Sequence, residues 1–258
     1  MESRSTHLYT VAFFLILLVI WYLITALRWV DPIILPSPGS VLRAYPEMIR
    51  DDRLVTDVLY TLGRVVGAVV LAGIIGVPLG LFFGYRRNIY RVVEPPLHAL
   101  RSVPASALFP LFLVVIGVGE ASILALAAYP SLLIILVNAA AGSALANKRR
   151  LHQARILGLS AWQIVTEFLF FEALPSIITG VRTAVSYALV LVIAVEMFVG
   201  MGVYGLGRKV YIFQSTYQMP KTYAAIALTA LVGISANLLL NAVERRVLRW
   251  LPHAHAGS

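Results

Sequence analysis

Three glycines in the C-terminal third have the spacing of a phosphate-binding loop. Gly200, Gly202 and Gly205 form a G-x-G-x-x-G pattern, which in dinucleotide-binding proteins lets the backbone approach a pyrophosphate. That chemistry requires a strand before the glycines and a helix after them, within a βαβ unit. Here an apolar run of membrane-span length comes first and a charged loop is expected to follow. The pattern therefore predicts a flexible outer turn rather than a cofactor site.

Other constellations that carry chemistry are missing from the sequence. It contains no P-loop, no H-E-x-x-H, no G-x-S-x-G and no paired carboxylates within its apolar runs. The absence of Cys excludes disulfides, thiol chemistry and Cys-ligated zinc. His253 and His255 are expected to belong to a solvated tail. We therefore expect a chain without catalytic residues, metal or cofactor, which does not bind ATP through a P-loop.

Charged and polar groups at membrane depth remain as functional candidates. Glu196 lies 14 residues beyond Arg182, or roughly 21 Å along a helix, and Arg64 enters the second apolar run from the same side. We expect a structural Arg64–Glu196 pair, with lining of a pathway by Glu196 as the alternative. Weaker candidates, which can line a path or bridge helices by hydrogen bonds, are Asn138, Ser186, Tyr187 and Asn237.

The elements that must position these groups are membrane helices. The chain of 258 residues is 60% hydrophobic and 13% charged, whereas soluble domains are about a quarter charged. A helix needs about 20 mostly apolar residues to cross a bilayer. The runs that meet this length are Tyr9–Leu27, Val58–Phe83, His98–Val118, Ala121–Leu145, Val181–Gly200 and Thr222–Val243. No A-x-A site follows the first run, so we expect it to remain as an uncleaved span. The expected fold is an all-α integral membrane protein with six transmembrane helices.

Basic residues predict the orientation, because Lys and Arg collect on cytoplasmic loops. The formal net charge of +9 is explained in this way, so no nucleic-acid partner is expected. One side carries eleven basic residues: Arg4, Arg86, Arg87, Arg91, Lys148, Arg149, Arg150, Arg155, Arg245, Arg246 and Arg249. The other carries seven: Arg28, Arg43, Arg50, Arg53, Arg208, Lys209 and Lys221. Both termini are therefore predicted to be cytoplasmic.

Two shorter patterns describe how the spans are joined. In residues 31–57, the apolar residues Val41, Leu42, Tyr45, Met48 and Ile49 recur with helical spacing, which predicts a short helix on the outer membrane surface despite Pro46. In the second span, a seam of small residues four apart allows close helix packing against an undetermined partner. Its members are Ala68, Ala72, Gly76, Gly80 and Gly84.

The longest cytoplasmic connection, residues 146–180, has structure of its own. Leu151, Ala154 and Leu157 share a helical face, and Gly158 supplies the left-handed conformation that ends a helix. Ser160 and Gln163 form a capping box for a second helix, and Leu159 and Ile164 have the spacing of a hydrophobic staple. A rigid hairpin of this kind suits docking to a partner, although basic residues resting on lipid phosphates would explain it as well.

The same stretch resembles the EAA loop of permease subunits in binding-protein-dependent ABC importers. Ala154, Gly158, Leu174 and Pro175 keep that pattern, and GLSAWQ and EALPSIITGVR look like the nitrate, sulfonate and taurine subfamily. The resemblance extends over about residues 31–250 through LPSPGSVL, TLGRV, RSVPASALFPL and residues 196–207. The sequence departs from the family pattern at His152, Gln153 and Phe171, which stand where the family has Glu, Ala and Pro.

The resemblance implies the type I importer permease fold, located in a bacterial inner membrane. It divides the chain into a first span (1–30), an outer linker (31–57), a permease core (58–250) containing the coupling loop (146–180), and a tail (251–258). The implied partners are cytoplasmic ATPase subunits, an extracytoplasmic solute-binding protein, a second permease copy and membrane lipid. The residues implied to contact the ATPase are His152, Gln153, Ala154, Gly158, Leu159, Ser160 and Trp162.

The cargo and the mechanism leave alternatives open. A sulfonate, taurine, nitrate, bicarbonate, a thiamine-precursor pyrimidine or riboflavin would suit the resemblance. An ATP-independent secondary transporter or channel is the alternative class, but such proteins normally carry membrane carboxylates for ion coupling. This chain offers Glu196 and the boundary residue Glu120.

Overall fold

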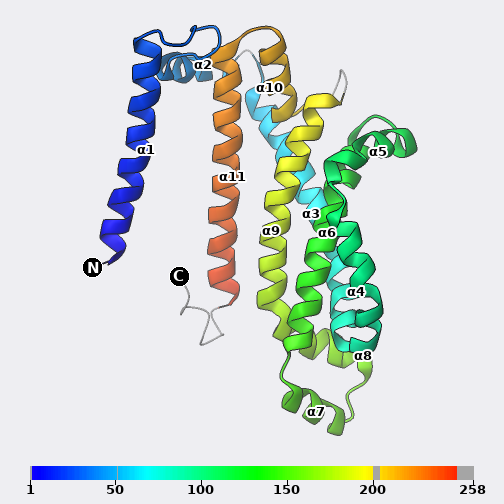
Figure 1. The fold of residues 1–258 in the computed structure, drawn as a ribbon. Helices are drawn as coiled ribbons and strands as arrows, with labels where there is room; N and C mark the ends of the chain where they lie inside the picture. Colours follow the sequence, from blue (N-terminus) through cyan, green and yellow to red (C-terminus); the bar gives the residue numbers. More distant parts are fainter. Residues whose placement is uncertain (1, 51, 200–203, 249–258) are drawn as a thin grey trace.

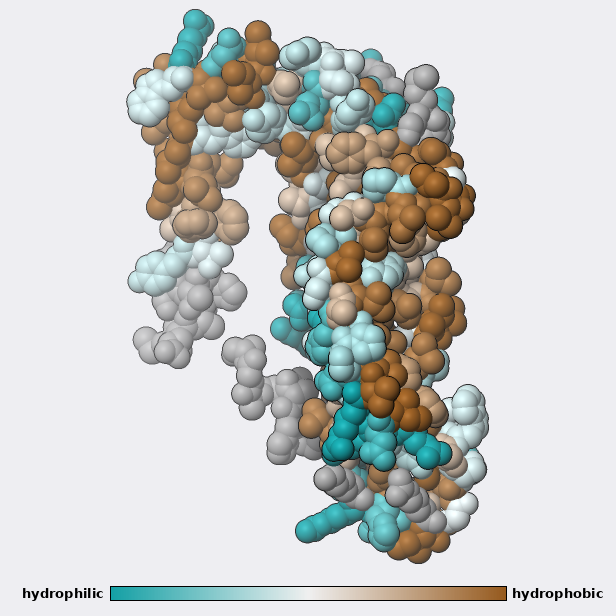
Figure 2. All heavy atoms as spheres, turned by 45° about the vertical axis from the view of Figure 1, so that its right-hand side comes forward, coloured by the Kyte–Doolittle hydropathy of each residue, from teal (hydrophilic) through white to brown (hydrophobic). Residues whose placement is uncertain are grey.

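A computed structural model describes residues 2–50, 52–199 and 204–248, and within these ranges the secondary structure is helical (Figure 1). Four predicted spans are single α-helices: α1 (Glu2–Ala26), α3 (Leu54–Tyr85), α6 (Glu120–Leu145) and α11 (Met219–Val247). Their apolar content is high enough for each to cross a membrane. Figure 2 shows apolar side chains along much of the bundle, as expected for a surface that faces lipid.

The predicted third span, His98–Val118, is not a single helix. The chain forms α4 (Arg87–Ser102), a short 3₁₀ turn η1 (Ala105–Leu108) and α5 (Phe109–Ile116), and the two arms are bent by 79°. Val103, which precedes Pro104, is extended with ψ 120°, because a residue before proline is disfavoured in the helical region. Pro110 lies at the start of α5, where its missing N–H is tolerated. The span is therefore a broken pair of helices.

The predicted fifth span begins too late in the sequence. Instead of starting at Val181, one helical rod runs from Ala161 to Phe198 through α8 (Ala161–Gln163), the π-helical segment η2 (Ile164–Leu169) and α9 (Phe170–Phe198). Pro175 lies inside α9. The connection before this rod therefore consists of α7 (Lys148–Ile156) and the turn after it, and the second helix of the predicted hairpin is the start of the span itself.

The core is made by α3, α6 and α9, which lie side by side (Figure 1). The seam of small residues on α3 faces α6 of the same chain, which settles the partner that the sequence left open. An added Cβ at Gly80 would lie 2.5 Å from the carbonyl oxygen of Leu136, and one at Gly84 would lie 2.5 Å from that of Ala140. The two backbones therefore approach as closely as glycine permits.

Two short helices close the end of the bundle opposite α7. The predicted surface helix exists as α2 (Pro38–Arg50) and packs against α11, burying Val41, Ala44 and Met48. Leu42 and Ile49 were expected on the same face but are 68% and 55% exposed. The Tyr45 hydroxyl donates a 2.9 Å hydrogen bond to the carbonyl of Ala224, and burial raises the pKa of Tyr45. The helix α1 stands apart along much of its length (Figure 1). It meets the rest at Trp21, which donates to the carbonyl of Pro36 at 3.0 Å and whose ring centroid lies 6.3 Å from that of Tyr223 of α11.

The prediction of a charged loop after the glycine pattern is wrong. A ten-residue helix, α10 (Leu206–Ser215), begins directly after Gly205 and packs between α9 and α11. Gly205 and Gly207 are buried, and the backbone of Gly205 has φ 146°. Gly200 and Gly202, like the tail histidines His253 and His255 and the basic residue Arg249, lie outside the described residues.

The close contact between α3 and α6 makes a testable prediction. We expect Gly80→Ala to destabilise the protein by about 1–3 kcal/mol, because the new methyl group must push the backbone of α6 away. Gly73→Ala is the matched control, since nothing lies within 4 Å of a Cβ added there. Unfolding of the two purified variants in mixed micelles measures the difference. Equal stabilities would show that the two helices separate easily.

Candidate functional site

A cluster of charged side chains lies at the end of the bundle closed by α2 and α10. Asp57, Thr61 and Arg64 project from one face of α3, and their side chains are buried, with exposed fractions of 1%, 0% and 3%. Their spacing of four and three residues places them above one another on that face. Buried charges are stable only when paired and hydrogen-bonded, so the neighbouring helices must supply partners.

Arg64 is the centre of this cluster. Its guanidinium donates to Oε2 of Glu120 through Nε (2.7 Å) and to Oε1 of Glu120 through Nη2 (2.5 Å). Nη1 donates to Oε1 of Glu196 and to the carbonyl oxygen of Tyr204, both at 2.5 Å. The guanidinium also lies over the ring of Tyr60, with 5.6 Å between Cζ and the ring centroid. The expected Arg64–Glu196 pair is therefore present, and it is extended by a bidentate pair with Glu120.

Glu196 is fully buried and receives hydrogen bonds from α3 and α10. The hydroxyl of Thr61 lies 2.9–3.0 Å from both carboxylate oxygens, and the amide of Gly207 donates to Oε2 at 3.0 Å. A Cβ on Gly205 would lie 2.4 Å from the Glu196 carboxyl carbon. Glycine at this position thus lets the backbone reach the carboxylate.

The first amides of α10 are bound by the same cluster. The amide of Gly205 donates to Oδ1 of Asp57 at 2.6 Å, and that of Leu206 donates to the Thr61 hydroxyl oxygen at 2.9 Å. Lys209 of α10 lies 3.5 Å from Oδ2 of Asp57. Amides at the start of a helix have no partner within the helix, so the carboxylates and the hydroxyl satisfy groups that would otherwise be buried unpaired. The cluster fastens α10 to α3 and α9.

Sequence reasoning missed Asp57, Thr61 and Lys209 and left Glu120 without a role. The available signal was the recurrence of polar residues at positions 57, 61 and 64, which share a helical face. The glycine pattern was noticed, but the function of its last glycine depends on Glu196, a residue of another helix. The contacts of Glu196 with protein groups support its structural role over the lining of a pathway.

The hairpin at the opposite end has the predicted local structure. Gly158 has φ 76°, the Ser160 hydroxyl accepts from the Gln163 amide at 3.3 Å, and the Gln163 side chain accepts from the Ser160 amide at 2.9 Å. Ala154 and Ile164 are buried in one apolar cluster, and Leu159 packs against it. The capping box and the apolar cluster therefore both fix the turn, which packs as part of the folded protein.

The residues assigned to ATPase contact fall into two groups. His152, Gln153, Gly158, Ser160 and Trp162 are exposed, so their surfaces are available to another protein. Ala154 is buried and Leu159 half-buried, which gives them a packing role. Phe171, at the position of the missing family proline, is 52% exposed. The family departures at His152 and Gln153 thus lie on the accessible surface.

The remaining polar candidates lie in different places. The Asn138 amide donates to the carbonyl of Ile134 at 2.8 Å and lies against Gly180. Ser186 and Asn237 line a pocket of about 320 Å³ between α9 and α11, and Tyr187 is 57% exposed. The structure thus brings Ser186 and Asn237 to one pocket, whereas Asn138 and Tyr187 do not line it.

Comparison with known proteins shows the family. The model of the family described as "Binding-protein-dependent transport system inner membrane component" matches residues 76–249. One relative, from Escherichia coli, carries the name "Putative aliphatic sulfonates transport permease protein SsuC". It is 30% identical to this chain, over 92% of this chain and 89% of the relative. The taurine transport system permease protein TauC of the same organism is 28% identical over 91% and 86%. The riboflavin transport system permease protein RibX of Chloroflexus aurantiacus is 29% identical over 92% and 87%. This chain belongs to the family of binding-protein-dependent inner membrane transport components.

Solved structures show the same fold. An inward-facing form of the MetNI methionine ABC transporter aligns with a TM-score of 0.67 at 20% identity, over 78% of this chain and 98% of the other. An amino acid ABC transporter with histidines aligns with a TM-score of 0.59 at 20% identity, over 78% and 97%. The fold is that of an ABC importer permease.

The buried ion pair makes a prediction about stability. Arg64→Met would leave Glu196 buried without its cation, and we expect a loss of about 3–5 kcal/mol in the free energy of unfolding. The Glu120 side chain is 53% exposed, so Glu120→Gln is expected to lose less than about 1 kcal/mol. Unfolding in mixed micelles compares the two variants. Losses of similar size would contradict the central position of the Arg64–Glu196 contact.

Proposed function

We propose that this chain is the permease subunit of an ATP-driven importer that carries a small sulfonate-type anion across the inner membrane. The family match supports the class of transporter, and the relatives named for taurine and aliphatic sulfonates support the class of cargo. The chain itself performs no covalent step. ATP is hydrolysed by a cytoplasmic partner, and a solute-binding protein delivers the cargo from outside.

The observation that carries the proposal is the continuous helical connection from the exposed hairpin to the buried cluster. The rod from Ala161 to Phe198 has 38 residues, which corresponds to about 57 Å at 1.5 Å per residue. Its first turn is capped by Ser160, and Glu196, near its end, holds α10 and Arg64. A displacement of the hairpin by the ATPase would therefore move the helix that anchors the outer end. This is the mechanical link that alternating access requires.

The orientation follows from the basic residues. The turn from α3 to α4, the helix α7 and the end of α11 carry Arg86, Arg87, Arg149, Arg150, Arg245 and Arg246. We assign this end to the cytoplasm, with both termini on that side. The cluster around Arg64 then lies at the outer end, where α2 and α10 face the solute-binding protein. A second permease copy completes the pathway.

Reconstitution tests the cargo directly. The permease is co-expressed with the ATPase and binding protein that co-purify with it from native membranes. Uptake of labelled taurine, an alkanesulfonate and riboflavin is then measured in proteoliposomes with ATP inside or outside. The proposal expects uptake of the sulfonates that requires ATP and binding protein. ATP-independent movement of solute would overturn the importer mechanism, and selective uptake of riboflavin would overturn the class of cargo.

The left-handed turn of the hairpin makes a prediction about coupling. Gly158→Val places a β-branched residue at φ 76°, a conformation that costs an ordinary residue about 1–2 kcal/mol, so transport-linked ATPase activity is expected to fall on the order of tenfold. Gly158→Asn is the matched control, since Asn tolerates this conformation. No atom lies within 4 Å of a Cβ added at Gly158, so both variants are expected to fold. Full coupling in the Val variant would exclude the turn from docking.

A further inference from the structure

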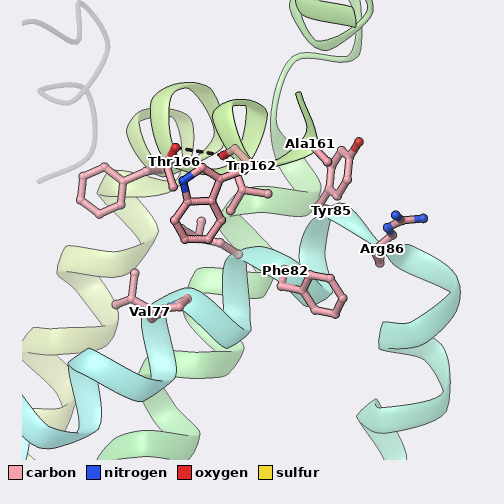
Figure 3. A pocket seen from close by; sticks show the side chains of 11 residues that line it. Val77, Phe82, Tyr85, Arg86, Ala161, Trp162 and Thr166 are labelled. Carbon is pink, nitrogen blue, oxygen red and sulfur yellow. Dashed lines mark hydrogen bonds between the residues drawn. The ribbon is translucent and has the colours of Figure 1, made fainter. Parts of the chain in front are cut away.

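An apolar pocket lies beneath the hairpin, between α3 and the beginning of the long helical rod. It has a volume of about 570 Å³, within the range of about 300–1,000 Å³ typical of ligand sites. Val77, Leu81 and Phe82 of α3 line one side, and Trp162 and Val165 line the other. Figure 3 shows the indole of Trp162 lying between the hairpin and α3, with Tyr85 and Arg86 toward the turn that ends α3.

A second, polar pocket of about 510 Å³ lies on the other side of that turn. It shares Tyr85 and Arg86 with the apolar pocket, and Arg87 and Asn88 also line it. Arg86 rests over the ring of Tyr85, with 5.7 Å between Cζ and the centroid, and Arg87 donates to the carbonyl of Ala144 at 2.6 Å. Within the described ranges neither guanidinium is paired with a carboxylate, in contrast to Arg150, which lies 2.7 Å from Glu172.

The depth of the apolar pocket selects its occupant. Val77 lies nine residues before Arg86, or roughly 13 Å along α3, so the floor of the pocket lies inside the span. A water-soluble partner does not reach that depth. A second copy of this chain would bring the same two arginines to the rim, and like charges repel. An amphiphile with an apolar chain and an anionic head matches both pockets.

We infer that the two pockets together form a binding site for an anionic phospholipid. One acyl chain lies in the apolar pocket against Trp162, and the phosphate lies at the Arg86 and Arg87 guanidinium groups. The lipid then fills the space between α3 and the hairpin and supports the base of the hairpin. The assignment of the site to the inner leaflet rests on the orientation proposed above. Lipid binding in a symmetric bilayer does not depend on that orientation.

Quenching of tryptophan fluorescence by brominated lipids tests the site without any partner protein. The full chain, carrying Trp21→Phe, Trp29→Phe and Trp250→Phe, retains Trp162 as its fluorophore and is placed in nanodiscs. Brominated phosphatidylglycerol and brominated phosphatidylcholine are added at the same low mole fraction. We expect an enrichment of phosphatidylglycerol at Trp162 on the order of tenfold. Equal quenching by the two lipids, or protection from both, would overturn the proposal.

Variants separate the two halves of the site. Arg86→Gln with Arg87→Gln is expected to abolish the preference for phosphatidylglycerol, whereas Arg245→Gln with Arg246→Gln removes the same charge from the end of α11 and should leave it intact. Val165→Phe fills the apolar pocket and should reduce quenching by either lipid. Native mass spectrometry of the unmodified chain gives a second readout of retained phosphatidylglycerol. A preference that survives loss of Arg86 and Arg87 would assign it to general surface charge.

Discussion

The pairing of Arg64 with Glu196 is the constraint on which the half of the structure closed by α2 and α10 depends. Both side chains are almost entirely buried, and a charge in such surroundings must find an opposite charge and hydrogen bonds. Glu120, Thr61 and the amide of Gly207 supply them. Because these groups come from α3, α6, α9 and α10, satisfying one ion pair fixes the mutual positions of four helices.

In the rest of the bundle, the positions of the helices are fixed by close backbone contact rather than by charge. Hydrophobic burial contributes little between helices in lipid, so association there depends on close packing. The glycines of α3 provide that packing against α6, and α9 closes the other side of α6. Rigid contact along this core lets the helical rod from Ala161 act as one body. The π-helical segment at Ile164–Leu169 lies where that rod leaves the hairpin. Short π-helical segments inside α-helices are frequent at functional sites.

The two ends of the molecule use different chemistry for different tasks. The end closed by α2 and α10 buries the charges of Asp57, Arg64 and Glu196. The basic end exposes its charges, and its hairpin combines a capped turn with a pocket whose lining is apolar. The function proposed above, with soluble partners on both membrane faces, requires a firm anchor at one end and an accessible surface at the other.

Much of this architecture was determined by the sequence alone. Four spans, the surface helix, the capping box and the Gly158 turn follow from runs of apolar residues and from local hydrogen-bonding preferences, which act over a few residues. The bend at Pro104 was signalled, but its 79° angle depends on packing. Asp57 binds the amide of Gly205, 148 positions later, and Thr61 binds Glu196, 135 positions later, so the role of both residues depends on helices distant in the sequence. Contacts between residues more than a hundred positions apart have no local pattern, so only the tertiary structure decided them.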